Sequence, residues 1–183
     1  MRINMLSFFK ILLIPICLFG WLFNDEDADL KAFENVLYQS AKFLEKKYNV
    51  SAMGSGGSIP EGIIKKFTLS FQMKRILTKE ECRKLLIAMG ADFLQLINNN
   101  KEVRPYLYKY PFEAKDININ LFIRDEKGNY VEHPNINVAD LFLGNLSYET
   151  QNYDQVKDSL KTISKEQESY EEALKIVKGN QKT

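Results

Sequence analysis

The chain has few residues of the kinds that bind metals or carry redox chemistry. It contains one histidine, His133, and two cysteines, Cys17 and Cys82. A single histidine excludes zinc sites built on two histidines, and the missing Cys-x-x-Cys pair excludes the common zinc and dithiol motifs. Because Cys17 lies in an apolar run and Cys82 in a predicted helix, we expect no disulfide between them. The sequence also has no cofactor signature, so we expect no cofactor. Cys82 is expected to be a small buried side chain, with pairing between chains as the alternative.

A strong excess of either charge is also missing. The 25 Lys and Arg residues against 24 Asp and Glu residues give a net charge of +1. Removing residues 1–23 would take away Arg2 and Lys10 and no acidic residue, which leaves a net charge of −1. Nucleic-acid-binding domains normally carry a basic surface, so we expect no nucleic-acid partner.

One apolar run stands at the N-terminus, where residues 11–23 read ILLIPICLFGWLF. Arg2 and Lys10 precede it and an acidic stretch follows, an arrangement that sends the rest of the chain across a membrane. We therefore expect residues 1–23 to be a signal peptide or signal anchor that contacts the membrane through residues 6–23. Three forms stay open: an uncleaved anchor, a cleaved signal, or a lipoprotein modified at Cys17. A buried core helix is the alternative without export.

The remaining chain carries three segments with helical spacing of apolar residues. Thr78 with Glu81 and Ser169 with Glu172 have the spacing of capping boxes, which mark helix N-termini. Gly179 is a helix-stop signal. The spacing predicts helices over 27–48, 79–97 and 169–179.

Alternation of apolar and polar residues predicts the strands. The clearest is Phe67–Met73, and Ile117–Ile123 has the same period. A turn at Asp125–Gly128 predicts a hairpin into a further strand. The expected strands cover residues 67–73, 117–123, 129–132 and 146–153, with a weak one at 161–166. We expect a single α+β domain at 24–179, an antiparallel sheet of about four strands with helices packed on one face, and a disordered tail at 180–183.

An aromatic segment is the most distinctive candidate binding surface. Two prolines bias Arg104–Phe112 toward extended backbone, which would place its aromatic side chains on one side. Such a row suits a peptide, a glycan or a partner strand. The alternative is that the rings cover the end of a helix and the edge of the sheet. The candidate partner-binding residues are Arg104, Tyr106, Tyr108, Tyr110 and Phe112, joined by Gly56 and Gly57 from a glycine-rich stretch.

The glycine-rich stretch, Met53–Pro60, is expected to be a loop. It lacks the Gly-Lys-Ser/Thr ending and the following helix of a phosphate-binding loop. Two interpretations of this stretch stay open, a flexible turn and a loop that closes over a ligand. Asn118 and Asn120 share one face of a predicted strand. Their amides suit a sugar, although a solvated strand face is the ordinary interpretation.

His133 is expected to lie in an exposed turn. The acidic pairs at 80–81 and 171–172 fall in first helical turns, where negative charge complements the helix dipole. Neither feature needs acid–base chemistry to explain it, so we expect no catalytic residue.

Several short motifs together resemble a family of small exported or membrane-anchored proteins of intracellular-living bacteria, to which no activity is assigned. They are the export segment with Gly54–Pro60 (GSGGSIP), Arg104–Leu107 (RPYL), Tyr110–Phe112 (YPF) and Ser169–Ala173 (SYEEA). The resemblance implies a bacterial cell-envelope location and transfers no functional residue.

The sequence therefore favours a non-catalytic interaction module, membrane-tethered or secreted, with its domain on the non-cytoplasmic side of the cytoplasmic membrane and a protein or peptide partner. Two alternatives remain. One is an envelope hydrolase acting on glycan or peptide through His133 or paired acids. The other is a structural envelope protein that self-associates.

Overall fold

The computed structural model describes residues 28–179. The predicted export segment at 1–23 and the tail at 180–183 lie outside these residues. The helices and strands, in chain order, are α1 (Ala28–Tyr48), β1 (Ser51–Ser58), β2 (Lys66–Met73), α2 (Lys79–Asn99), β3 (Ile117–Ile123), β4 (Val138–Phe142), β5 (Asn145–Asp154), β6 (Ser159–Ser169) and α3 (Tyr170–Gly179).

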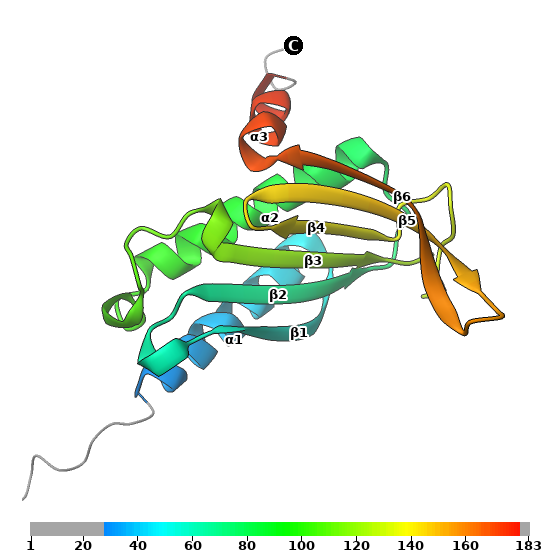
Figure 1. Cartoon of the computed structure of the whole chain (residues 1–183). Helices are drawn as coiled ribbons and strands as arrows, with labels where there is room; N and C mark the ends of the chain where they lie inside the picture. Colours follow the sequence, from blue (N-terminus) through cyan, green and yellow to red (C-terminus); the bar gives the residue numbers. More distant parts are fainter. Residues whose placement is uncertain (1–27, 180–183) are drawn as a thin grey trace, which may run out of the picture.

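The strands form one mixed sheet in the order β1-β2-β3-β4-β5-β6 (Figure 1). β2 and β3 run parallel, whereas every other neighbouring pair is antiparallel. The α+β class is confirmed, but the expected antiparallel sheet of about four strands is wrong in strand number and in one pairing. The parallel pair follows from the connection, because α2 crosses over between β2 and β3 and returns the chain to the same end of the sheet.

One face of the sheet is apolar, and α1 and α2 lie across it as the sequence predicts (Figure 1). The period of two in the strands sends alternate residues to this face. They bury almost completely against the inner faces of the two helices. The largest of these buried side chains include Phe67, Phe71, Leu69, Ile119, Leu121, Leu44, Leu86, Met89 and Phe93. The opposite face carries polar side chains, among them Thr68, Ser70, Asn118 and Asn120.

The N-terminus of α2 has the predicted capping box. The Thr78 hydroxyl accepts a hydrogen bond from the Glu81 backbone N–H at 3.2 Å, and the Glu81 carboxylate accepts one from the Thr78 backbone N–H at 2.8 Å. Arg75 also donates to Glu81, at 2.7 Å. The Arg75 and Thr78 hydrogen bonds together lower the pKa of Glu81 from 4.5 to about 2. The second predicted capping box, Ser169 with Glu172, forms in the same way at α3.

We expect the free energy of unfolding of Glu81→Gln to fall less between neutral and acid pH than that of the unchanged protein. A carboxylate whose pKa is lower in the folded chain stabilises the fold above its unfolded pKa, and this contribution is lost as the pH falls through the folded pKa. The window for Glu81 therefore runs from pH 4.5 down to about 2. Urea-unfolding midpoints measured across this window should converge for the variant and the unchanged protein at the acid end. Parallel curves would contradict the assignment.

Two segments differ from the sequence prediction. The glycine-rich stretch is not a loop but most of the edge strand β1, which pairs with β2 along its whole length. After the predicted turn at Asp125–Gly128, the expected strand at 129–132 is reduced to a single bridge between Arg124 and Tyr130. The partner strand of β3 is instead β4.

A buried ion pair ties α2 to β6. Arg83 is 5% exposed, and its Nε lies 2.7 Å from Oε1 of Glu168. The Tyr148 hydroxyl donates to the same carboxylate oxygen at 2.5 Å, while Glu80 accepts from the other end of the guanidinium. Burial penalises the guanidinium charge, but the two carboxylates outweigh it and raise the pKa of Arg83.

The β5–β6 hairpin reaches beyond the rest of the sheet (Figure 1). β4 pairs with β5 only as far as Glu149, whereas β5 and β6 stay paired to the Asp154–Ser159 end. At the connecting turn Val156 is 94% exposed. The distal half of the hairpin therefore projects into solvent with no other strand of residues 28–179 beside it.

Candidate functional site

The aromatic segment divides between core and surface. Arg104–Tyr106 forms a turn of 3₁₀ helix rather than the expected extended backbone. Phe112 is buried, with its ring 5.8 Å from that of Phe67, and Tyr106 is half-buried against the core. The Asn98 side chain fixes Phe112 by accepting from its backbone N–H at 2.8 Å and donating to its carbonyl at 3.0 Å. The segment is thus attached to the end of α2.

Tyr108 and Tyr110 are the exposed aromatic residues of the segment, at 43% and 53%, and Arg104 is exposed beside them. The Tyr108 hydroxyl donates to Asp116, and partial burial together with this hydrogen bond raises the pKa of Tyr108. The Tyr110 hydroxyl donates to the Asn98 carbonyl at 3.3 Å, and the Arg104 guanidinium lies 4.3 Å above its ring. Both hydroxyl groups therefore have partners within the fold, an arrangement that matches rings covering the end of α2.

The two candidate glycines occupy different faces of β1. Gly56 stands opposite Thr68 on the polar face, and a Cβ added there would have no neighbour within 4 Å. Gly57 stands opposite Phe67 on the face toward α1, where a Cβ would lie 2.0 Å from the Lys66 carbonyl oxygen. Only glycine fits at position 57.

Gly57 and Phe112 are joined through one aromatic cluster. The Phe33 ring of α1 lies over Gly57 and stacks on Phe67 at 4.9 Å between centroids. Phe67 contacts Phe112, whose ring lies 5.6 Å from that of Tyr108. The structure thus brings part of the aromatic segment and one candidate glycine together, but through the core rather than on a shared surface.

A groove of about 410 Å³ runs between α1 and β1, next to the edge where β1 has no further strand beside it among residues 28–179. We call it the α1–β1 groove. Leu37 and Ala41 form its apolar floor, and Tyr38 is 65% exposed at its side. The remaining lining residues are Glu34, Lys42, Glu45, Ala52, Gly54 and Ser55.

One end of this groove is already closed by a side chain. The Glu45 carboxylate accepts from the Ala52 backbone N–H at 2.7 Å and pairs with Lys42 at 3.0 Å. The hydrogen bond from Ala52 contributes most, and that from Lys42 next, to lowering the pKa of Glu45. The Ala52 backbone N–H is thus already hydrogen-bonded to a carboxylate of α1. Farther along β1, Gly54–Ser58 carries only glycine and serine.

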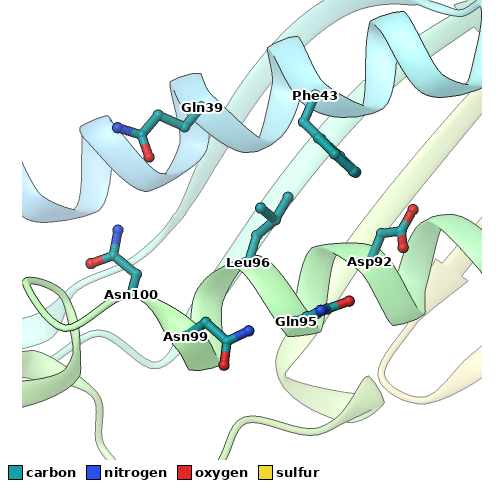
Figure 2. Close-up of a pocket in the computed structure, with 7 residues that line it drawn as sticks. All are labelled: Gln39, Phe43, Asp92, Gln95, Leu96, Asn99 and Asn100. Carbon is teal, nitrogen blue, oxygen red and sulfur yellow. The ribbon is translucent and has the colours of Figure 1, made fainter.

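A second groove, of about 380 Å³, lies between α1 and α2 on the side away from the sheet. In Figure 2, Phe43 points from α1 toward α2 and Leu96 points from α2 toward α1. At one end Asp92 pairs with Lys47 and accepts from the Tyr48 hydroxyl, each at 2.6 Å. Burial and this acceptor raise the pKa of Tyr48. The charged and phenolic groups here satisfy one another and join the two helices.

His133 and the acidic pairs are placed apart from these grooves. His133 is exposed, and its Nδ1 lies 3.0 Å from the Thr150 hydroxyl. Glu80–Glu81 and Glu171–Glu172 occupy the first turns of α2 and α3. Among residues 28–179, no three His, Cys, Asp or Glu side chains come together as a metal site would require. Cys82 is fully buried, as expected, and burial raises its pKa to about 12.

The sequence contains one weak signal for the α1–β1 groove. Tyr38 directly follows a buried leucine of the predicted helix, and an exposed tyrosine beside an apolar face is a common feature of binding surfaces. The groove itself depends on β1, which was predicted as a loop. Only the folded chain places α1 beside that strand.

No helix among residues 28–179 is both long and apolar enough to cross a membrane, and the predicted anchor lies outside them. Comparison of the chain with protein-family models, with curated proteins and with solved structures gives no match.

Proposed function

We propose that this chain is a non-catalytic interaction module of the bacterial envelope that captures an extended peptide segment of a partner protein. The peptide would lie along the outer edge of β1 as an additional strand. The α1–β1 groove beside this edge is the observation that carries the proposal.

An edge strand offers backbone N–H and C=O groups to any extended chain. Charged or bulky residues usually block such edges, yet Gly54–Ser58 carries only glycine and serine. Within residues 28–179, no strand pairs with the outer side of β1. Backbone pairing would supply affinity here, and the adjacent groove would select side chains.

The groove indicates which side chains would suit it. Leu37, Tyr38 and Ala41 offer apolar contact to alternate residues of a bound strand. Glu34 forms no ion pair among the described residues, whereas Glu45 is paired with Lys42. A peptide with apolar residues at alternate positions and a basic residue near Glu34 fits this lining best.

We propose that residues 1–23 export the chain and either anchor it or are removed. The cationic start, the apolar run and the acidic residues that follow support this part. The domain would then meet its partner outside the cytoplasm. Cell fractionation with the mass of the mature N-terminus tests this independently of peptide binding.

The binding test uses the full chain against an array of random peptides as long as β1, which has 8 residues. We expect Tyr38→Ser to weaken binding of a selected peptide at least tenfold, because an exposed aromatic anchor is lost. Tyr110→Ser is the matched control, a tyrosine outside the groove that is 53% exposed against 65% for Tyr38, and it should bind normally. Fluorescence anisotropy measures both affinities.

Methylation of the peptide backbone distinguishes strand addition from other contacts. Only every second N–H of an added strand points toward β1, so methylated nitrogens of one parity should abolish binding and those of the other should not. Absence of peptide binding, or a loss caused by Tyr110→Ser and not by Tyr38→Ser, would overturn the assignment of the groove. The second result would return the site to the aromatic segment.

A further inference from the structure

The face of the sheet that no helix among residues 28–179 covers contains a further hollow, which differs chemically from the two grooves. It has a volume of about 230 Å³ and lies over β3, β4, β5 and β6, on the side opposite the helices. Its floor is formed by Asn120, Asp140 and Ser147, and Gln167 stands at the β6 side. We call it the sheet hollow. It is separate from the α1–β1 groove.

The floor of the sheet hollow is held in a fixed arrangement. The Asn120 side-chain N–H donates to the Ser70 hydroxyl at 3.0 Å, which leaves the amide oxygen as an acceptor. Ser147, 2% exposed, donates to one oxygen of Asp140 at 2.6 Å. The other Asp140 oxygen and the Gln167 amide have no hydrogen-bond partner among residues 28–179. The Asn120 amide oxygen, one Asp140 oxygen and the Gln167 amide are therefore available to hydrogen-bond a ligand in the hollow.

The charge in the hollow disfavours an anionic ligand. Its only cation, Lys165, is paired with Glu149 at 2.6 Å, while Asp140 forms no ion pair within the described residues. Burial raises the pKa of Asp140, which reflects how little water reaches this carboxyl. An anion such as phosphate would meet Asp140 on the floor, and the one lysine that lines the hollow is already paired; Lys66 lies at the rim, with its Nζ 5.5 Å from the centroid of the Phe142 ring.

The rim of the hollow is apolar and conformationally strained. Phe142 and Leu143 are 50% and 52% exposed. Leu143 and Gly144 form the β4–β5 turn with φ of +51° and +78°, and leucine rarely adopts such a φ. A turn of this kind normally carries asparagine and glycine. Strained residues at exposed positions commonly belong to ligand sites.

We propose that the sheet hollow binds a neutral sugar residue of a glycan. Each sugar hydroxyl both donates and accepts, which the carboxylate of Asp140 and the amides of Asn120 and Gln167 can match. The Phe142 ring, half exposed and with the Lys66 Nζ 5.5 Å from its centroid, offers an apolar surface to the C–H face of the sugar. A ligand of this class satisfies the free polar groups without adding a charge.

The test uses the full chain, purified in a detergent without a sugar headgroup, on an array of oligosaccharides. The neutral probes contain glucose, galactose, mannose or N-acetylglucosamine, and the anionic probes are sialylated or sulfated. We expect neutral probes to bind and Phe142→Ser to weaken binding at least tenfold. Phe43→Ser is the matched control, a phenylalanine of similar exposure in the α1–α2 groove, and should bind normally.

A second variant addresses the polar floor. Asp140→Asn preserves the shape of the side chain but replaces an acceptor with a donor, so it should also weaken binding at least tenfold. Circular dichroism melting curves would show whether each variant remains folded. No binding of neutral probes, preference for anionic probes, or equal binding by folded Phe142→Ser would overturn the proposal. Peptide capture at β1 would be unaffected by any of these results.

Discussion

Replacing Arg83 by methionine is expected to lower the free energy of unfolding by about 4 kcal/mol, the cost of leaving a buried carboxylate without its partner. The Glu168 side chain is 12% exposed, so water reaches little of it once the guanidinium is gone. Tyr148 would still donate to Glu168 but carries no positive charge. Urea unfolding followed by circular dichroism measures the loss.

A double variant separates the ion pair from the packing of the Arg83 side chain. Replacing Glu168 by glutamine together with Arg83→Met removes both charges and keeps an acceptor for the Tyr148 hydroxyl, so it should recover much of the lost stability. The double-mutant cycle then gives the interaction between the two residues. If the double variant is as unstable as Arg83→Met alone, the unpaired charge is not the cause.

Gly57→Ala is expected to lower the free energy of unfolding by about 3 kcal/mol, because the new methyl group has no room. Its Cβ would lie 2.0 Å from the Lys66 carbonyl oxygen and 2.7 Å from Cζ of Phe33. The first neighbour is backbone of β2, and the second is a ring stacked on Phe67, so neither can move cheaply. β1 would have to separate from β2 or from α1.

Gly56→Ala is the matched control one residue away. The added Cβ has nothing within 4 Å, so stability should change by less than about 1 kcal/mol. Both variants are measured by urea unfolding. Equal effects at the two positions would show that alanine acts through the strand backbone in general and not through the contact with Phe33 and Lys66.

The sequence predicted the elements whose local pattern agrees with their final surroundings. β2 and β3 alternate because one face is buried, and the capping boxes at Thr78 and Ser169 act within a single helical turn. These features depend on neighbours close in the chain. The sequence therefore predicts the bounds of α2, α3, β2 and β3 to within a few residues.

β1 could not be predicted in the same way, because its stability comes from β2 and α1 and not from its own residues. Glycine and serine have low strand propensity and indicate a loop. The requirement at Gly57 arises only when Phe33 packs over it. The α1–β1 groove, which depends on β1, was missed for the same reason.

The aromatic segment shows the reverse case. Its composition suggests that its aromatic rings form one exposed surface. In the structure Phe112 is buried in the core, and the Tyr110 hydroxyl donates to the Asn98 carbonyl at the end of α2. Those partners lie on elements that the local pattern does not connect to the segment. The sequence identified a region of dense contacts without showing which side of it meets solvent.

The projecting β5–β6 hairpin offers a place to attach a reporter. Its turn around Val156 lies outside the residues that line the α1–β1 groove and the sheet hollow. Exposed turns of this kind tolerate inserted sequence. An epitope or a photo-crosslinking residue placed there would allow a partner to be recovered from cells while leaving both proposed binding surfaces unaltered.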